Sequence, residues 1–280
     1  MSKAINVNTK TENQVAPFAP GEAHQRSVFE TLLTDAIDKP GILSEAYRAF
    51  HNYSIGNQLL AASQLIDRGL PIAPIASFNT WREKGRFVKK GEKAIKLFMP
   101  VTIKEKDKET KEETGSVFQT FMLRPNWFSL DQTEGVEIDN EAKTAEWNPE
   151  LALAALGITQ TRFEQLSGNC QGYATGNEIA INPLAALPHK TRFHELAHII
   201  LGHTTEGMMS DDEQTPKNIK EVEAEGVAYI LVSILGLPGQ VESRGYIQNW
   251  LAGDKIEEKS ARKIFTAADK IMKAGQPVMA

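Results

Sequence analysis

The run TRFHELAHIILGH, residues 191–203, constrains this chain more than any other segment. It places His194 and His198 four residues apart, and on a helix this spacing projects both imidazoles from one face. Neutral imidazoles are good zinc ligands, and Glu195 between them can take a proton from a metal-activated water. A surface helix with two histidines is the alternative, but the apolar flanks favour a buried helix. We therefore expect a Zn²⁺ site, with Mn²⁺ as the other candidate ion, and Glu195 as catalytic base.

A catalytic zinc needs a third protein ligand, and the acidic run EVEAE lies on a predicted helix downstream. Glu221 and Glu225 share a helix face, whereas Glu223 points elsewhere. One carboxylate can bind the metal while the other, one turn later, accepts a hydrogen bond from a ligating imidazole. The arrangement resembles the gluzincin metallopeptidases, which makes Glu221 the ligand and Glu225 the orienting residue. We interpret Glu223 as a solvated position, although it stays the alternative ligand.

Two further features flank the metal motif. His203 follows His198 by five residues, whereas the metzincin metallopeptidases place a third histidine ligand six residues after the second. We therefore interpret His203 as a residue at the helix C-terminus. Residues 178–182, before the motif, have the length and alternation of a short strand. In zincins an edge strand beside the active-site helix binds extended peptide by strand addition. A strand that only completes a small sheet is the alternative.

A basic, aromatic segment covers residues 81–96, with seven basic and two acidic residues in a chain of net charge −5. Trp81 and Phe87 are interleaved with the positive charges. Single-stranded nucleic-acid sites combine a basic track for phosphates with aromatic faces for bases. The alternative is a charged turn whose aromatic residues belong to the core.

The segments FHNYSIGNQLL and FNTWREKGRFVKKGEKAIKLFMP resemble the N-terminal domain of the ArdC-like antirestriction proteins, and VFQTFMLRPNWFSLDQTEG does so more loosely. The resemblance runs from about Ala23 to Leu237. It implies a plasmid-borne protein with an N-terminal single-stranded DNA-binding domain and a C-terminal zincin-like metallopeptidase domain. The metal residues that it implies are those named above. Its implied DNA-binding residues are Asn52, Tyr53, Ser54, Asn57, Trp81, Arg82, Lys84, Arg86, Lys89, Lys90 and Lys93.

The expected fold is α+β with two domains. Residues 20–135 would form the single-stranded DNA-binding domain, and residues 145–280 a mostly helical zincin-like domain with a small sheet. Charge supports the division, because residues 1–135 carry 18 Lys and Arg against 16 Asp and Glu, whereas the rest carries 13 against 20. We expect strands at 94–101 and 116–123 around a charged loop, and a linker at 131–148. Hydrophobic periodicity predicts helices at 28–37, 42–50, 55–67, 188–201, 218–235, 240–251 and 254–274.

The single cysteine, Cys170, excludes an internal disulfide framework and fits a reducing compartment. We interpret it as a small buried residue, with a nucleophile as the alternative. The first twenty residues are polar, and no apolar run approaches the roughly 20 residues that span a bilayer, so we expect a cytoplasmic protein without a membrane partner. The expected partners are single-stranded DNA and, if the peptidase is active, a protein substrate. The rival functions are a DNA-recruited protease, a repressor-cleaving protease, and a DNA-binding protein with a structural metal.

Overall fold

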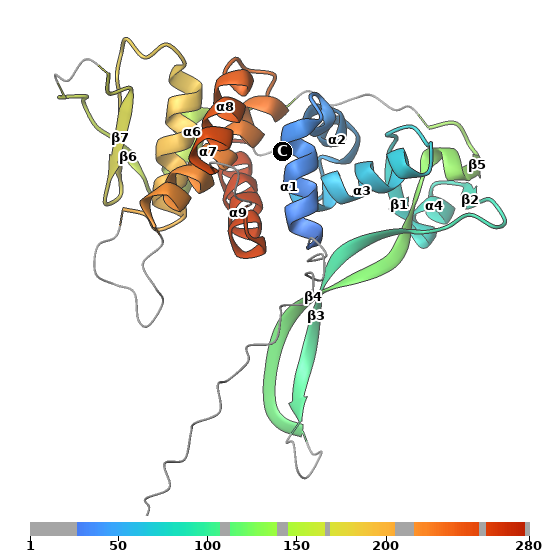
Figure 1. Cartoon of the computed structure of the whole chain (residues 1–280). Coiled ribbons are helices and arrows are strands. Elements are labelled where there is room, and N and C mark those ends of the chain that lie inside the picture. Colours follow the sequence, from blue (N-terminus) through green and yellow to red (C-terminus); the bar gives the residue numbers. More distant parts are fainter. Residues whose placement is uncertain are drawn as a thin grey trace, which may run out of the picture.

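The computed structural model describes residues 27–106, 113–138, 145–165, 169–204, 216–251 and 256–277 (Figure 1). The tail expected before residue 20 lies outside them. The first half contains, in order, α1 (Val28–Asp38), α2 (Ile42–Phe50), α3 (Ile55–Asp67), β1 (Ile75–Ser77), α4 (Phe78–Glu83), β2 (Arg86–Val88), β3 (Ile95–Lys106), β4 (Glu113–Ser129), η1 (Leu130–Gln132) and β5 (Thr133–Gly135). The second half contains α5 (Pro149–Leu156), β6 (Thr159–Gln160), β7 (Gly172–Thr175), β8 (Glu178–Ile181), α6 (Pro188–Ile200), α7 (Lys217–Ile234), α8 (Gln240–Leu251) and α9 (Glu258–Ala274). The chain is therefore α+β, as predicted.

The first helices begin where the sequence supplies caps. Ser27 Oγ accepts a hydrogen bond from the Glu30 backbone, and the Glu30 carboxylate accepts one from the Ser27 backbone, each at 3.2 Å. This reciprocal capping box fixes the start of α1. Ser54 caps α3 through the backbone of Asn57. Each helix buries one apolar face, so α1, α2 and α3 pack around a shared core.

A long twisted hairpin of β3 and β4 projects away from the helices (Figure 1). Both strands are longer than the sequence predicts, because antiparallel pairing continues through charged residues as far as Lys106 and Glu113. The predicted charged loop is therefore shorter than expected, and its centre, residues 107–112, lies outside the described residues.

The predicted linker at 131–148 is wrong at its beginning. Residues 133–135 form β5, which pairs antiparallel with β2. The Arg86 guanidinium secures this pair by donating to Thr133 Oγ1 at 2.8 Å and to the Thr133 carbonyl at 2.9 Å. This stretch therefore belongs to the first half of the chain. Residues 139–144 lie outside the described part.

Helix α7 forms the centre of the second half, since every residue from Val222 to Ile234 is buried. Helices α6, α8 and α9 pack around it. Gly226 allows α9 to come close, because a Cβ atom at this position would lie 3.0 Å from Ile264 Cδ1. A small sheet of order β6-β8-β7 lies against α6. None of the described helices is long and apolar enough to cross a membrane.

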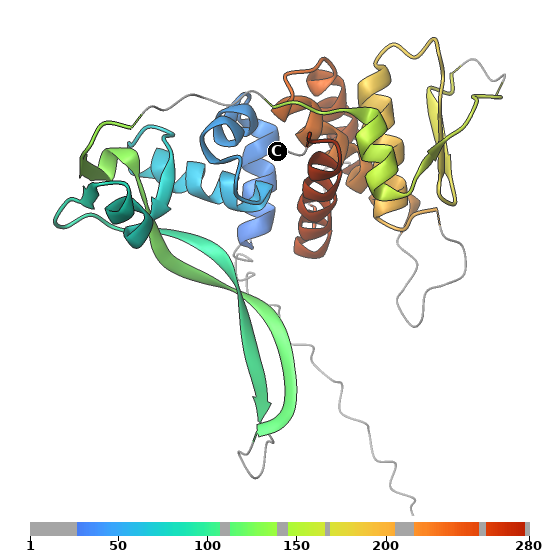
Figure 2. The same cartoon turned by 180° about the vertical axis from the view of Figure 1, so that it is seen from behind.

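The two halves share one continuous hydrophobic core. Figures 1 and 2 show α1 beside α9, and α2 also packs against α7. The buried Tyr229 hydroxyl of α7 donates to the Ala36 carbonyl of α1 at 2.8 Å. That carbonyl has no helical partner, because the residue four positions later is Pro40, which lacks an N–H. The Ile55 backbone N–H donates to Asp269 of α9 at 2.9 Å, so α3 is capped from the second half.

Candidate metal centre and nucleic-acid surface

His194 and His198 lie one turn apart on α6, and their Nε2 atoms are 3.0 Å apart. Phe193, Leu196 and Ala197 are buried on the other faces of the helix, so the imidazoles are held by a packed helix. The structure thus places both histidines as the sequence pattern predicts, with one nitrogen of each ring directed at a common point.

Glu221 approaches this point from α7. Its carboxylate oxygens lie 3.5 Å from His194 Nε2 and 3.9 Å from His198 Nε2. Zinc bonds of 2.0–2.1 Å in tetrahedral geometry separate ligand atoms by about 3.3 Å, which is close to the three observed distances. These side chains form the group among the described residues that could hold a metal ion. Two imidazoles favour Zn²⁺, and the carboxylate is also compatible with Mn²⁺.

Glu225 lies directly behind His194. Its carboxylate is 3.0 Å from His194 Nδ1 and 2.6 Å from the Lys190 ammonium. Burial acts to raise the pKa of Glu225, but the hydrogen bond with His194 and the charge of Lys190 lower it to about 2. The carboxylate therefore stays ionised and favours a proton on His194 Nδ1, which leaves Nε2 to bind a metal.

A second chain of contacts supports His198, and the sequence analysis missed it. His198 Nδ1 lies 3.0 Å from His203 Nδ1, and His203 Nε2 lies 3.0 Å from a Glu223 carboxylate oxygen. The prediction that Glu223 is solvated is wrong, because Glu223 is 0% exposed. Packing of α9 on α7 covers it and brings the Lys263 ammonium to 3.8 Å. His203 joins His198 to Glu223.

Glu195 lies between His194 and His198 in the sequence, and its side chain is buried beside β7. The strand approaches so closely that a Cβ atom on Gly172 would lie 3.2 Å from Glu195 Cγ and 2.7 Å from Thr191 Cγ2. Burial raises the pKa of Glu195 to about 7, although the neighbouring His194 acts in the opposite direction. A carboxyl group with this pKa can both accept and donate a proton near neutral pH.

The pKa values of His194 and His198 diverge. Burial acts to lower the pKa of His194, but hydrogen bonds with Glu221 and Glu225 outweigh it and raise the pKa to about 9. Burial and the charge of His194 lower the pKa of His198 to about 4. Two imidazolium rings with nitrogens 3.0 Å apart would repel each other, so the pair holds only one proton beyond those of two neutral rings. Metal binding needs two neutral imidazoles and must displace that proton.

A cavity of about 700 Å³ opens over these residues, and β7 forms one of its walls. The prediction that residues 178–182 form the edge strand is wrong, because β8 is the central strand and pairs with both β6 and β7. Its partner β7 is the edge strand at the cavity. Spacing could not reveal this order, because β6 reaches β8 through a parallel pairing from a distant segment.

The residues at 52–57 that were expected to bind DNA mostly hold the fold together. The Tyr53 hydroxyl donates to the Ile75 carbonyl at 3.2 Å, and Ser54 caps α3. The Asn57 amide donates to the Phe98 carbonyl and accepts from the Phe98 N–H, which joins α3 to β3. Asn52 is exposed.

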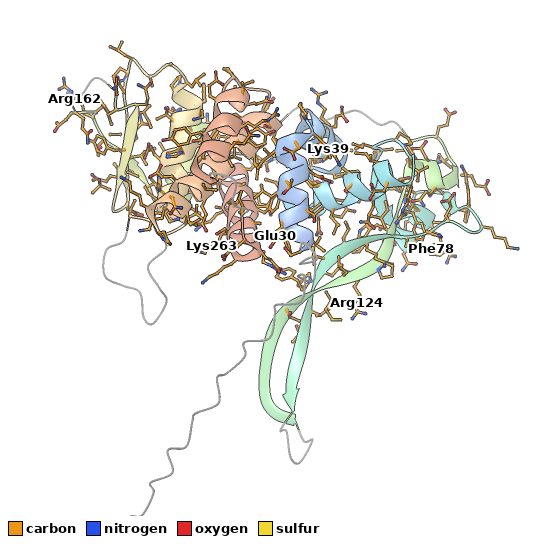
Figure 3. All side chains as sticks on the ribbon, viewed as in Figure 1. Glu30, Lys39, Phe78, Arg124, Arg162 and Lys263 are labelled. Atoms are coloured by element: carbon orange, nitrogen blue, oxygen red, sulfur yellow. The ribbon has the colours of Figure 1, made fainter. Side chains whose placement is uncertain are left out.

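The basic, aromatic segment divides into core and surface. Trp81 is 2% exposed, and its indole N–H donates to the Phe128 carbonyl, while Arg86 holds β5 as described above. The accessible aromatic residues are Phe87, which is 57% exposed, and Phe78, which Figure 3 shows on the outer side of the first half. The exposed basic residues of the segment are Arg82, Lys84, Lys89, Lys90, Lys93 and Lys96.

A HExxH helix, a carboxylate from the next helix and an adjacent edge strand make the second half zincin-like in arrangement. Residues 36–125 match the family model for the N-terminal domain of anti-restriction factor ArdC. This part of the chain is therefore similar to the N-terminal domain of ArdC.

Two solved structures share this fold. Both are of the antirestriction protein ArdC from plasmid R388, one metal-free and one with bound Mn(II). Their TM-scores are 0.53 and 0.52 at 22% identity, and each match covers 88% of this chain and 93% of the other. No curated protein matches the chain.

Proposed function

We propose that this chain is a cytoplasmic antirestriction protein that binds single-stranded DNA and carries a metallopeptidase-type centre. The observation that carries the proposal is the convergence of His194, His198, Glu221 and Glu195 on one cavity, in a chain with an ArdC-type N-terminal domain. The Mn(II)-bound relative supports a divalent ion at such a fold. Protection of incoming plasmid DNA is the role that best unites the two halves. We assign DNA binding to residues 20–135 and the metal centre to residues 145–280.

The substrate that suits the cavity is an extended polypeptide. Among the described strands, β7 has a partner on one edge only, and this strand lines the cavity beside the metal centre. A peptide can add to such an edge through main-chain hydrogen bonds, which would place its carbonyl groups over His194 and His198.

The chemistry follows from the positions of the side chains. His194, His198 and Glu221 would hold the ion, which when bound supplies Lewis acidity that polarises a carbonyl and lowers the pKa of water. Glu195 accepts the proton of the attacking water and delivers it to the amine that leaves, since its pKa is about 7. Glu225 keeps a proton on His194 Nδ1, and Gly172 lets β7 lie close to Glu195.

DNA binding is assigned to the exposed part of the basic segment. Arg82, Lys84, Lys89, Lys90 and Lys93 would contact phosphates, since their side chains are exposed. Phe78 and Phe87 offer exposed aromatic faces beside them. Binding through phosphates and stacking carries little sequence preference.

Metal analysis combined with Glu195→Gln tests the metal centre. The variant removes the base but keeps all three ligands, so it should retain one ion per chain while hydrolysis of an unfolded protein substrate falls at least 100-fold. Equal hydrolysis by both proteins would refute the catalytic role. A wild-type chain that binds the ion and DNA but hydrolyses nothing would favour the rival with a structural metal.

Oligonucleotide binding tests the other half. A Lys89→Glu, Lys90→Glu variant should weaken binding to all sequences. In a plot of log binding constant against log salt concentration, each lost phosphate contact should lower the slope by about 0.7. A wild-type chain without salt-dependent binding would instead favour a repressor-cleaving protease. A wild-type chain that binds and cleaves proteins only when both lie on DNA would favour a recruited protease.

A further inference from the structure

A groove of about 500 Å³ lies where the two halves meet, away from the metal centre. Helices α1 and α3 and the β3/β4 hairpin line it from the first half, and α9 lines it from the second. We define the groove by Phe29, Phe98, Phe121, Arg262, Lys270 and Lys273. These residues come from segments more than 200 positions apart, so no sequence motif unites them.

One wall of the groove is a preassembled stack. Phe29 and Phe98 lie parallel with ring centroids 4.9 Å apart and an interplanar angle of 17°. The Arg262 guanidinium lies 4.3 Å from the Phe29 centroid, and the Glu258 carboxylate, one turn earlier, accepts from its Nε at 2.7 Å. Such an alternation of flat groups is the kind of surface on which a planar aromatic ligand stacks.

An accessible ring continues this wall. Phe98 pairs with Leu123, and Phe121 pairs with Pro100, so Phe98 and Phe121 share one face of the hairpin. Phe121 is 62% exposed, which is unusual for a ring on a sheet that faces a groove. It provides a free aromatic face at the mouth of the groove.

Positive charge dominates the α9 side. Lys270 and Lys273 are exposed, and Arg262 lies on the same helix two turns before Lys270. The acidic residue of the lining, Asp269, already accepts the Ile55 N–H. The groove thus offers aromatic faces on one side and an excess of cations on the other, which suits an aromatic base attached to a phosphate chain.

The groove offers little that could read a base edge. Both amide atoms of Asn57 are used by the Phe98 backbone, and the Thr266 hydroxyl donates to the Arg262 carbonyl. Recognition would therefore depend on ring faces and charge rather than on base identity.

We propose that this groove is a base-binding subsite for single-stranded DNA, in which one base stacks on Phe121 and the flanking phosphates contact Lys270 and Lys273. The inference rests on the proposed DNA-binding function and extends it, because it makes the last helix of the metal-centre half a part of the DNA site. The two halves then act on DNA only when they are joined.

Fluorescence anisotropy with a labelled oligothymidine and full-length variants tests the subsite. Phe121→Ala should weaken binding roughly 5- to 100-fold, as expected for loss of one stacked base. Met122→Ala is the matched control, since Met122 is exposed on the opposite face of the same strand, and it should bind like the wild type. Both changed side chains are exposed, and circular dichroism would verify their folding.

A Lys270→Glu, Lys273→Glu double variant tests whether these two charges contact phosphates. The slope of log binding constant against log salt concentration should fall by about 1.4, for two lost phosphate contacts. Lys39→Glu is the charge control, because Lys39 lies at the end of α1 that is far from the hairpin (Figure 3). Ultraviolet crosslinking of an oligonucleotide that contains 5-iododeoxyuridine should attach it to the peptide containing Phe121.

The outcomes separate this inference from the function on which it rests. Wild-type affinity in Phe121→Ala and in the double lysine variant, with weaker binding in Lys89→Glu, Lys90→Glu, would overturn the subsite and leave DNA binding intact. An altered oligomeric state of Phe121→Ala with unchanged affinity would show that the groove binds protein instead. A wild-type chain that binds no oligonucleotide would refute the proposed function itself.

Discussion

His194 and His198 are held in different ways. His194 contacts Glu225 directly, whereas His198 reaches Glu223 through His203. A metal at both Nε2 atoms requires a proton on each Nδ1, so His198 must donate to His203 Nδ1 and His203 Nε2 must donate to Glu223. One arrangement of protons therefore satisfies all of these hydrogen bonds. The contacts of His194 end at the buried Glu225 carboxylate, and those of His198 end at the buried Glu223 carboxylate.

Replacing the three glutamates of α7 should produce three different results. Glu221→Ala should abolish tight metal binding, because a ligand is lost. Glu225→Ala should lower metal affinity roughly 10- to 100-fold, because only the orientation of His194 is lost. Glu223→Ala should lower the free energy of unfolding by about 1–3 kcal/mol, since it leaves the buried His203 N–H without an acceptor.

Competition with a chromogenic chelator measures metal affinity in these variants, and thermal unfolding measures their stability. Glu223→Gln is the matched control, because its amide oxygen can still accept from His203. If Glu223→Ala loses the ion while Glu221→Ala retains it, the ligand assignment is wrong by two residues.

At the scale of elements, the distance between β7 and α6 determines where Glu195 lies. Gly172→Ala should force the strand outward, since its Cβ would lie 2.7 Å from Thr191 Cγ2 and 3.1 Å from the Ala180 carbonyl oxygen. We expect hydrolysis to fall by at least tenfold with metal content unchanged. Gly245→Ala is the control, because nothing lies within 4 Å of its Cβ and alanine favours the α8 helix. Equal losses in both variants would indicate general destabilisation.

Most helices were predictable from the sequence because each carries its own signals, whereas α5 (Pro149–Leu156) was not predicted. The bounds of α2 and α3 follow from an apolar period between Gly, Pro and Ser residues. Strand order was not predictable, since β8 becomes central only through its pairing with β6. For the site, His194, His198 and Glu221 are placed together as their spacing indicates, whereas the burial of Glu223 depends on α9, whose contact no local pattern encodes.

At the scale of the whole molecule, the first and last helices belong to one core. Tyr229→Phe should lower the free energy of unfolding by about 1–3 kcal/mol, because the buried Ala36 carbonyl loses the hydroxyl that replaces its helical partner. Chemical denaturation followed by fluorescence and by circular dichroism checks this value. Two separate transitions in the wild type would contradict a shared core.

The contact between α1 and α9 also has a consequence for biosynthesis. A ribosome adds about 5–20 residues per second, so roughly ten to forty seconds pass between the emergence of α1 and that of α9. During that interval the apolar face of α1 and the backbone N–H of Ile55 lack their final partners. The nascent first half must therefore stay soluble in an incomplete form until α9 has emerged.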